Sequence, residues 1–354
     1  MNIYLTEIAS AAAIAQENMQ REHVPGLAMA FIKNGELVMS QCLGIADTER
    51  GIPVSNETYF EAASLTKPFF GRLVFELADE GVIDLDRPLS EYEQAWTPCT
   101  DARFACVTAK DVMSHASGLP NWGKLPMELY FEPKHGFSYS GMGYYYLQSI
   151  IEKRLGTRLD DLMQKCLLDP FGMDKAALIW TGAMRNALAR TVDVNGHAEP
   201  KRTTARHSMG MEPNSAFSLY VTIDDYPKFL LNILKEPDFA ARVRSVRNCA
   251  GNGVEWGLGW GLYNERIWHW GDNGGFKSLV CFDPATRDAL LIQRRGDDLR
   301  GDSRHVEAEQ RRIRPRVHPN AGHLQQRVAH HAAQGGRRFA RLPLMRQRKP
   351  HPRI

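Results

Sequence analysis

An Asn-Gly pair between two apolar runs is the feature near the start of the chain that most constrains its fold. Residues 27–33 read Leu-Ala-Met-Ala-Phe-Ile-Lys, Asn34-Gly35 follows, and residues 36–40 read Glu-Leu-Val-Met-Ser. Asn-Gly between apolar runs is the strongest short-range signal for a β-hairpin. Before it, apolar residues at positions 3–19 fall near one stripe, which predicts an amphipathic helix. We therefore expect the chain to begin with a helix followed by two hairpin strands.

Strand patterns return only at the far end of the sequence. Four short apolar or aromatic runs, separated by turn residues, lie between residues 254 and 293, whereas residues 89–215 carry mainly helical patterns and loops. Strands at both ends with helices between them predict an α+β fold, in which an antiparallel sheet is flanked by helices. We expect residues 1–88 and 216–295 to form this sheet subdomain and residues 89–215 to form an inserted, mainly helical subdomain.

Composition limits where such a chain can work and what it can bind. No run of 18 apolar residues occurs, so no membrane-spanning helix is expected. The N-terminus has no early Lys or Arg, and Glu7 interrupts its apolar run, which is unlike a signal peptide. A cytoplasmic protein is expected, or a periplasmic one if a leader is missing from the sequence. The six cysteines form no C-x-x-C and fit no zinc spacing, so we expect reduced thiols and no metal.

The last part of the chain differs in charge from the rest. Residues 294–354 hold 15 Arg and 1 Lys against 5 acidic residues, while the preceding part has more acidic than basic side chains. Three interpretations of the basic Arg/His-rich tail (296–354) are open: a disordered extension, a non-specific binder of anions such as nucleic acid, or out-of-frame translation of a GC-rich gene. We favour the third, and expect no specific nucleic-acid partner.

A candidate nucleophile lies in the stretch "EAASLTKPFF". If these residues are helical, Ser64 and Lys67 share one face at positions i and i+3. A lysine can then act as the base that activates the serine, provided that burial lowers its pKa. A plainer interpretation makes Ser64 a helix N-cap, with Pro68 early in the helix. Chance alone yields about one S-x-x-K in a chain of this length, so the motif decides nothing by itself.

Two further short motifs stand on suitable elements. Tyr139-Ser140-Gly141 lies where a helix is expected to begin, and His269-Trp270-Gly271-Asp272 lies on a predicted strand before a glycine-rich turn. The plain interpretations are an aromatic residue beside a helix cap and a half-buried strand histidine. Neither motif carries a function by itself.

In this order, the three motifs resemble the serine β-lactamase and penicillin-binding-protein superfamily, in particular its class C β-lactamase-like branch, which also holds esterases and D-aminopeptidases. Ser64-Leu65-Thr66-Lys67 matches the S-x-x-K motif, Tyr139-Ser140-Gly141 the Tyr-x-Asn motif, and His269-Trp270-Gly271 the Lys-Thr-Gly motif. The stretches "VPGLAMAFIKNGELV", "SHASGLPNW" and "GLGWGLY" also resemble the family, and the resemblance covers about residues 3–293. It implies a β-lactamase/transpeptidase-like fold.

The resemblance also implies a mechanism and roles for the matching residues. Ser64 would form an acyl-enzyme, Lys67 would be its base, and Tyr139 would carry a proton to the leaving group, helped by a pKa lowered by Lys67. The backbone N–H groups of Ser64 and Asp272 would hold the oxyanion, and no cofactor would be needed.

Two departures from the family pattern bear on the substrate. His269 replaces the lysine that helps to bind a β-lactam carboxylate, and Gly141 replaces an asparagine whose amide could bind a substrate amide. We therefore expect a small-molecule substrate, with a carboxylic-ester hydrolase first. A peptidase acting on D-amino acid or muropeptide-type amides, a β-lactamase, and a catalytically inactive binding or regulatory protein remain alternatives. Aromatic residues could line an apolar acyl pocket or belong to the core: Trp122, Tyr144, Tyr145, Trp256, Trp260 and Trp270.

Overall fold

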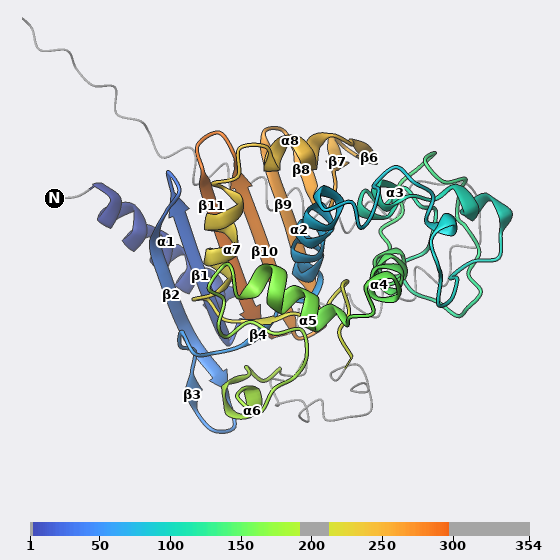
Figure 1. The fold of residues 1–354 in the computed structure, drawn as a ribbon. Coiled ribbons are helices and arrows are strands. Elements are labelled where there is room, and N and C mark those ends of the chain that lie inside the picture. The colour runs from blue at the N-terminus through green and yellow to red at the C-terminus, as the bar shows by residue number, and fades with distance from the viewer. Residues whose placement is uncertain (1–2, 192–211, 297–354) are drawn as a thin grey trace, which may run out of the picture.

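A nine-stranded antiparallel sheet forms the centre of the structure (Figure 1). The computed structural model describes residues 3–191 and 212–296. The strands follow the order β3-β2-β1-β11-β10-β9-β8-β7-β6. Their bounds are β1 Gly26–Lys33, β2 Glu36–Asp47, β3 Ile52–Pro53, β6 Asn248–Gly251, β7 Val254–Trp256, β8 Gly261–Tyr263, β9 Arg266–Asp272, β10 Phe276–Asp283 and β11 Asp288–Arg295. Because β1 pairs with β11, the sheet is built from both ends of the described chain, and the predicted α+β class is confirmed.

The predicted hairpin forms between β1 and β2. Asn34 and Gly35 both have positive φ, 53° and 80°, as a two-residue hairpin turn requires. The strands predicted after residue 254 form as well, except that the first predicted run is divided between β7 and β8. A separate two-stranded pair joins β4 (Phe60–Glu61) to β5 (Tyr220–Val221), directly before the segment that carries Ser64.

Helices cover both faces of the sheet. The α-helices are α1 Ile3–Arg21, α2 Thr66–Asp79, α3 Ala109–Met113, α4 Gly141–Leu155, α5 Leu159–Met163, α6 Met184–Ala187, α7 Tyr226–Ile233 and α8 Phe239–Arg244. Short 3-10 turns span Ala63–Leu65, Leu89–Glu91 and Ala102–Cys106, and a π-helical turn spans Gln164–Leu168. The described part of α1 packs through Met19 against Leu27 and Met29 of β1. The alternate residues Ala28 and Ala30 join the main core, together with α2, α7 and α8, on the other face.

The region between the two halves of the sheet has two parts. Helices α3 and α4 lie beside α2, to the right in Figure 1. From α5 onward the chain returns to the sheet, where Tyr59 pairs with Leu188 and Ala177 with Tyr220 in isolated bridges. This return brings the segment before β5 close to α2.

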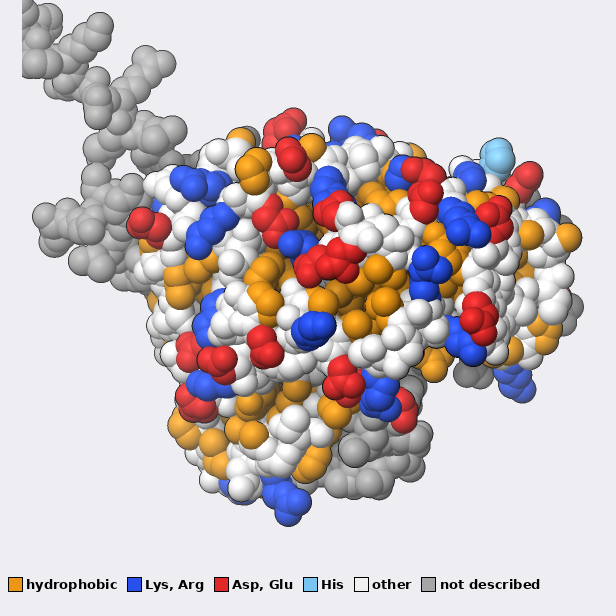
Figure 2. Space-filling model, in the orientation of Figure 1, with side chains coloured by type: hydrophobic (Ala, Val, Ile, Leu, Met, Phe, Trp, Pro, Cys, Tyr) orange, Lys and Arg blue, Asp and Glu red, His pale blue; other side chains and the backbone are white. Residues whose placement is uncertain are grey.

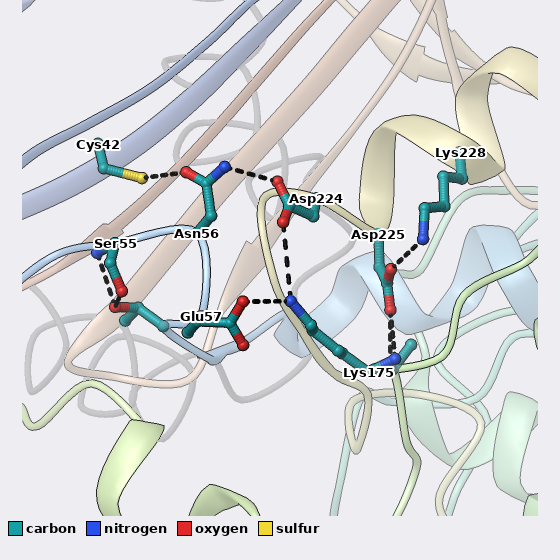
Figure 3. Close-up of polar contacts among 10 residues, drawn as sticks. Cys42, Ser55, Asn56, Glu57, Lys175, Asp224, Asp225 and Lys228 are labelled. Carbon is teal, nitrogen blue, oxygen red and sulfur yellow. Dashed lines mark hydrogen bonds and ion pairs between the residues drawn. The ribbon is translucent and has the colours of Figure 1, made fainter.

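A polar network fixes the return. The buried carboxylate of Asp225 accepts hydrogen bonds from the backbone N–H groups of Lys175 and Ala176 at 2.7 and 2.8 Å, and it pairs with Lys228 (Figure 3). Asn56 donates to Asp224 at 2.9 Å and accepts from the Cys42 thiol. These contacts tie the loop after β3 to the N-terminus of α7, and they hold β5 in position next to β4.

The surface gives limited functional information. On the face drawn in Figure 2, acidic and basic side chains are interspersed between small apolar areas. None of the described helices is long and apolar enough to cross a lipid bilayer. The interpretations of the basic tail concern residues that lie outside the described part of the chain, apart from Gly296.

Candidate active site

Ser64 lies in a tight turn directly before α2. The interpretation of Ser64 as a helix cap is wrong, because Ser64 belongs to the 3-10 turn Ala63–Leu65 and α2 begins at Thr66 without a side-chain cap. Ala63 has φ of 53°, a left-handed conformation that costs a residue with a Cβ about 1–2 kcal/mol. The Thr66 hydroxyl holds this turn, since it donates to the Ala63 carbonyl at 2.6 Å and accepts from the Leu219 N–H at 3.0 Å. This turn places Ser64, which is partly exposed, directly before α2.

Lys67 is buried in the first turn of α2, with only 1% of its surface exposed. Its Nζ lies 3.2 Å from Ser64 Oγ and donates to the Ala216 carbonyl at 2.9 Å. Burial lowers the pKa of Lys67 well below the usual value for lysine, because the charged form loses its hydration. A neutral amine beside a serine hydroxyl can accept its proton, so the spacing predicted from the sequence brings a candidate base into contact with a candidate nucleophile.

Tyr139 completes the group, but its electrostatics differ from the expectation. The Lys67 amine lies 4.7 Å from the centre of the Tyr139 ring. Burial raises the pKa of the Tyr139 hydroxyl, and the nearby Ser64 hydroxyl offsets this only in part. The expected lowering of the Tyr139 pKa by Lys67 is therefore wrong, because burial disfavours both the phenolate and the ammonium. The Tyr139 hydroxyl has no hydrogen-bond partner of acceptable geometry, which leaves it available as a proton donor.

His115 is a neighbour of the group that the sequence analysis did not single out. Its imidazole is fully buried and lies against the Tyr139 ring, with 4.2 Å between the ring centres. Its Nδ1 accepts a hydrogen bond from the Ser140 N–H at 3.1 Å, so the proton of the neutral ring is on Nε2. Burial, followed by the proximity of Lys67, lowers the His115 pKa well below its usual range. The only sequence signal was that His115 stands within "SHASGLPNW", a stretch that resembles the family.

Strand β9 supplies the remaining predicted residues. His269 is fully buried, and its Nδ1 donates to the Trp270 carbonyl at 2.7 Å. Burial, together with Lys67, lowers the His269 pKa to about 3, so the ring is neutral at ordinary pH. His269 thus does not provide the positive charge of the lysine that it replaces in the family pattern. Trp270 is half-buried and packs on Tyr139 with 5.1 Å between ring centres.

Gly271 and Asp272 lie where β9 passes the Ser64 turn. A Cβ on Gly271 would lie 2.1 Å from the Ala62 carbonyl oxygen, so only glycine allows this approach. The Asn273 N–H donates to the Phe276 carbonyl, and in an antiparallel ladder the backbone groups of Asp272 must then point away from β10. On that side β8 pairs with β9 only as far as Trp268. The Asp272 N–H therefore points out of an unpaired strand edge, while its exposed side chain pairs with Lys277 at 2.6 Å.

The aromatic residues named from the sequence separate into three groups. Tyr144, Trp256 and Trp260 are buried in the core, and Tyr145 packs on Trp96 with 5.5 Å between ring centres. Trp122 is exposed, whereas Trp270 is half-buried and packs on Tyr139. No three His, Cys, Asp or Glu side chains of residues 3–191 and 212–296 come together as metal ligands would.

Comparisons with known proteins identify the family of this chain. The family model named Beta-lactamase matches residues 11–305. The chain is 23% identical over 309 residues to protein flp of Staphylococcus aureus, an alignment that spans 79% of this chain and 61% of flp. It is also 23% identical over 325 residues to esterase EstB of Burkholderia gladioli, covering 77% of this chain and 80% of EstB.

Solved structures share the fold at low identity. A class C β-lactamase superposes with a TM-score of 0.72 at 19% identity, covering 84% of this chain and 95% of the other. The octameric penicillin-binding protein homologue from Pyrococcus abyssi gives a TM-score of 0.70 at 20% identity, covering 81% and 73%. At such identities these structures support the β-lactamase/transpeptidase-like fold and no particular substrate.

Proposed function

The chain belongs to the Beta-lactamase family, and from this premise we propose that it is a carboxylic-ester hydrolase that works through a Ser64 acyl-enzyme. One observation carries the proposal: the buried Lys67 amine lies 3.2 Å from the Ser64 hydroxyl. A serine hydroxyl attacks a carbonyl only when a base takes its proton, and Lys67, whose pKa is lowered by burial, is suited to that task.

In the proposed reaction, Lys67 takes the Ser64 proton as Ser64 Oγ forms a bond to the ester carbonyl carbon. The backbone N–H groups of Ser64 and Asp272 stabilise the oxyanion of the tetrahedral intermediate. The bond to the alcohol then breaks, and Tyr139 donates its proton to the departing oxygen while it regains one from Lys67. Water attacks the acyl-enzyme by the same route in reverse and releases the acid and free Ser64.

The charge of the site favours an ester over a substrate that carries a carboxylate. His269 is neutral and buried, so it offers no cation to the carboxylate of a β-lactam or of a peptide. Gly141 offers no side-chain amide to a substrate amide. EstB, which is named an esterase, is one of the relatives of this chain. Ser64 and Lys67 are in contact, with Tyr139 beside Lys67, which disfavours a purely regulatory role.

Hydrolysis of p-nitrophenyl butyrate by the folded wild-type chain and by Ser64→Ala tests the proposal. We expect release of p-nitrophenol by the wild type and its loss in Ser64→Ala, while Ser245→Ala, which changes an exposed serine, keeps wild-type activity. Mass spectrometry of the protein after brief exposure to the ester should find the butyryl group on the peptide that contains Ser64. Activity that survives in Ser64→Ala, or an acyl group on another residue, contradicts the mechanism. Faster turnover of the β-lactam nitrocefin than of any ester contradicts the substrate assignment.

A further inference from the structure

Trp122 occupies the space of the side chain that Gly141 lacks. A Cβ built on Gly141 would lie 2.2 Å from Cζ2 of the Trp122 indole and 2.7 Å from its Cε2. Gly141 is the first residue of α4, two positions after Tyr139. An asparagine at this position would collide with the indole, so the missing amide is replaced by an aromatic surface.

Hydrogen bonds to the start of α4 hold Trp122 in this place. The side chain of Asn121 accepts from the Gly141 N–H at 2.8 Å, and its backbone carbonyl accepts from the Met142 N–H at 2.9 Å. The Ser140 hydroxyl donates to the Pro120 carbonyl at 2.8 Å. The segment that carries Trp122 is therefore fastened to the same turn that carries Tyr139.

Phe217 forms the second part of the surface and is anchored to the same helix. Its ring lies 5.7 Å from the Trp122 ring in an edge-to-face arrangement. Gln148 of α4 is buried and holds the preceding segment, because it donates to the Pro213 carbonyl at 2.9 Å and accepts from the Ser215 N–H at 2.8 Å. Both rings thus keep their positions relative to Tyr139 through α4.

The position of the two rings links them to the reacting groups. Phe217 directly follows Ala216, whose carbonyl accepts the hydrogen bond from Lys67. Trp122 keeps 44% of its surface exposed, an unusual exposure for an indole with so many fixed neighbours. Trp270 and His269 also lie against the Tyr139 ring, and they belong to β9, the strand of the proposed oxyanion donor. The departing alcohol meets the Tyr139 hydroxyl, so the aromatic surface beside Gly141 and Ala216 is assigned to the acyl chain.

We propose that Trp122 and Phe217 form the wall that binds the acyl group of the substrate, and that this group is apolar and longer than acetyl. The inference rests on the proposed esterase function. An exposed indole edge-to-face with a phenyl ring binds apolar chains by burying their surface, and it offers no partner to a charged or amide-rich acyl group.

The test compares p-nitrophenyl acetate, butyrate and hexanoate on wild type, Trp122→Ala and the control Tyr130→Ala. Tyr130 is more exposed than Trp122 and belongs to the same region of the chain. We expect kcat/KM of the wild type to rise with acyl length, at up to about fourfold per buried methylene. Trp122→Ala should lower the hexanoate-to-acetate ratio of kcat/KM roughly tenfold, since it removes one side of the wall. Tyr130→Ala should leave the ratio unchanged.

A second pair of variants measures the contact without using activity. Gly141→Ala should destabilise the wild type, because the new Cβ displaces the indole. In the Trp122→Ala background it should be neutral or stabilising, since alanine is the better helix residue. Urea unfolding of the four proteins measures this difference.

The outcomes distinguish the two proposals. Ser64-dependent hydrolysis with an unchanged acyl-length ratio in Trp122→Ala overturns the wall and leaves the esterase standing. Equal effects of Gly141→Ala in both backgrounds also overturn the wall. No hydrolysis of any ester by the folded wild type overturns both proposals.

Discussion

Replacing Tyr139 with phenylalanine separates the proposed catalytic role of this residue from its structural role. The Tyr139 ring packs on His115 and Trp270, with 4.2 and 5.1 Å between ring centres. The Lys67 Nζ atom lies 4.7 Å from the centre of the Tyr139 ring. A phenyl ring preserves all these contacts. The hydroxyl that it removes is buried and has no hydrogen-bond partner of acceptable geometry. Leaving such a group unpaired costs a folded protein about 1–3 kcal/mol.

Tyr139→Phe should therefore be as stable as the wild type or more stable by up to about 2 kcal/mol. Its kcat for p-nitrophenyl butyrate should fall by about 100- to 10,000-fold, which corresponds to roughly 3–5 kcal/mol of lost transition-state stabilisation. Urea unfolding followed by circular dichroism gives the free energy of unfolding, and steady-state kinetics gives kcat.

Tyr144→Phe is the matched control, because it makes the same chemical change in a fully buried tyrosine that is hydrogen-bonded. The Tyr144 hydroxyl donates to the Met113 carbonyl at 3.2 Å. Its loss should cost about 1 kcal/mol of stability and change kcat only a few-fold. If the free energy of unfolding of Tyr139→Phe is more than about 1 kcal/mol below that of the wild type, the Tyr139 hydroxyl is hydrogen-bonded in the wild type. If it keeps more than a tenth of the wild-type kcat, Tyr139 does not carry the proton.

Three further changes test other parts of the structure. Lys67→Met should abolish hydrolysis. Burial lowers the Lys67 pKa, so between that pKa and about pH 10.4 the unfolded wild type binds one more proton than the folded protein. The free energy of unfolding of the wild type should therefore rise with pH in this range. Urea unfolding at pH 7 and 9 should show this rise for the wild type and not for Lys67→Met. Gly271→Ala forces a Cβ against the Ala62 carbonyl oxygen and should lower the free energy of unfolding by about 1–3 kcal/mol. Single-turnover kinetics should show slower acylation of Ser64. Unchanged stability would contradict the close approach of Gly271 to Ala62. Asp225→Ala removes the acceptor of two backbone N–H groups and the partner of Lys228 (Figure 3), so it should lower the free energy of unfolding by about 3 kcal/mol. A decrease of less than about 1 kcal/mol would show that the fold does not depend on this network.

Local signals in the sequence were sufficient for most of the secondary structure. The Asn34-Gly35 hairpin and the helix that begins after Ser140 form as their residues predict. Each depends on a few neighbouring residues, such as the Ser140 hydroxyl that accepts from the Gly143 N–H. The pairing of Lys67 with Ser64 is of the same kind, because one helical turn separates them.

The properties of the site depend instead on segments that are distant in sequence. The direction of the Tyr139 pKa shift could not be predicted, because it follows from burial among His115, Trp256 and Trp270 rather than from the motif. The left-handed Ala63 before Ser64 was missed for a similar reason, since contacts with Leu219 compensate its strain.

The sequence by itself determined the family resemblance, the order of the elements and the residue types available for acyl transfer. Only the tertiary structure decided that His269 is neutral, that His115 supports Tyr139, and that Trp122 fills the space beside Gly141. A motif specifies which groups a chain contains, whereas their charge and accessibility depend on how much water the rest of the fold removes from around them.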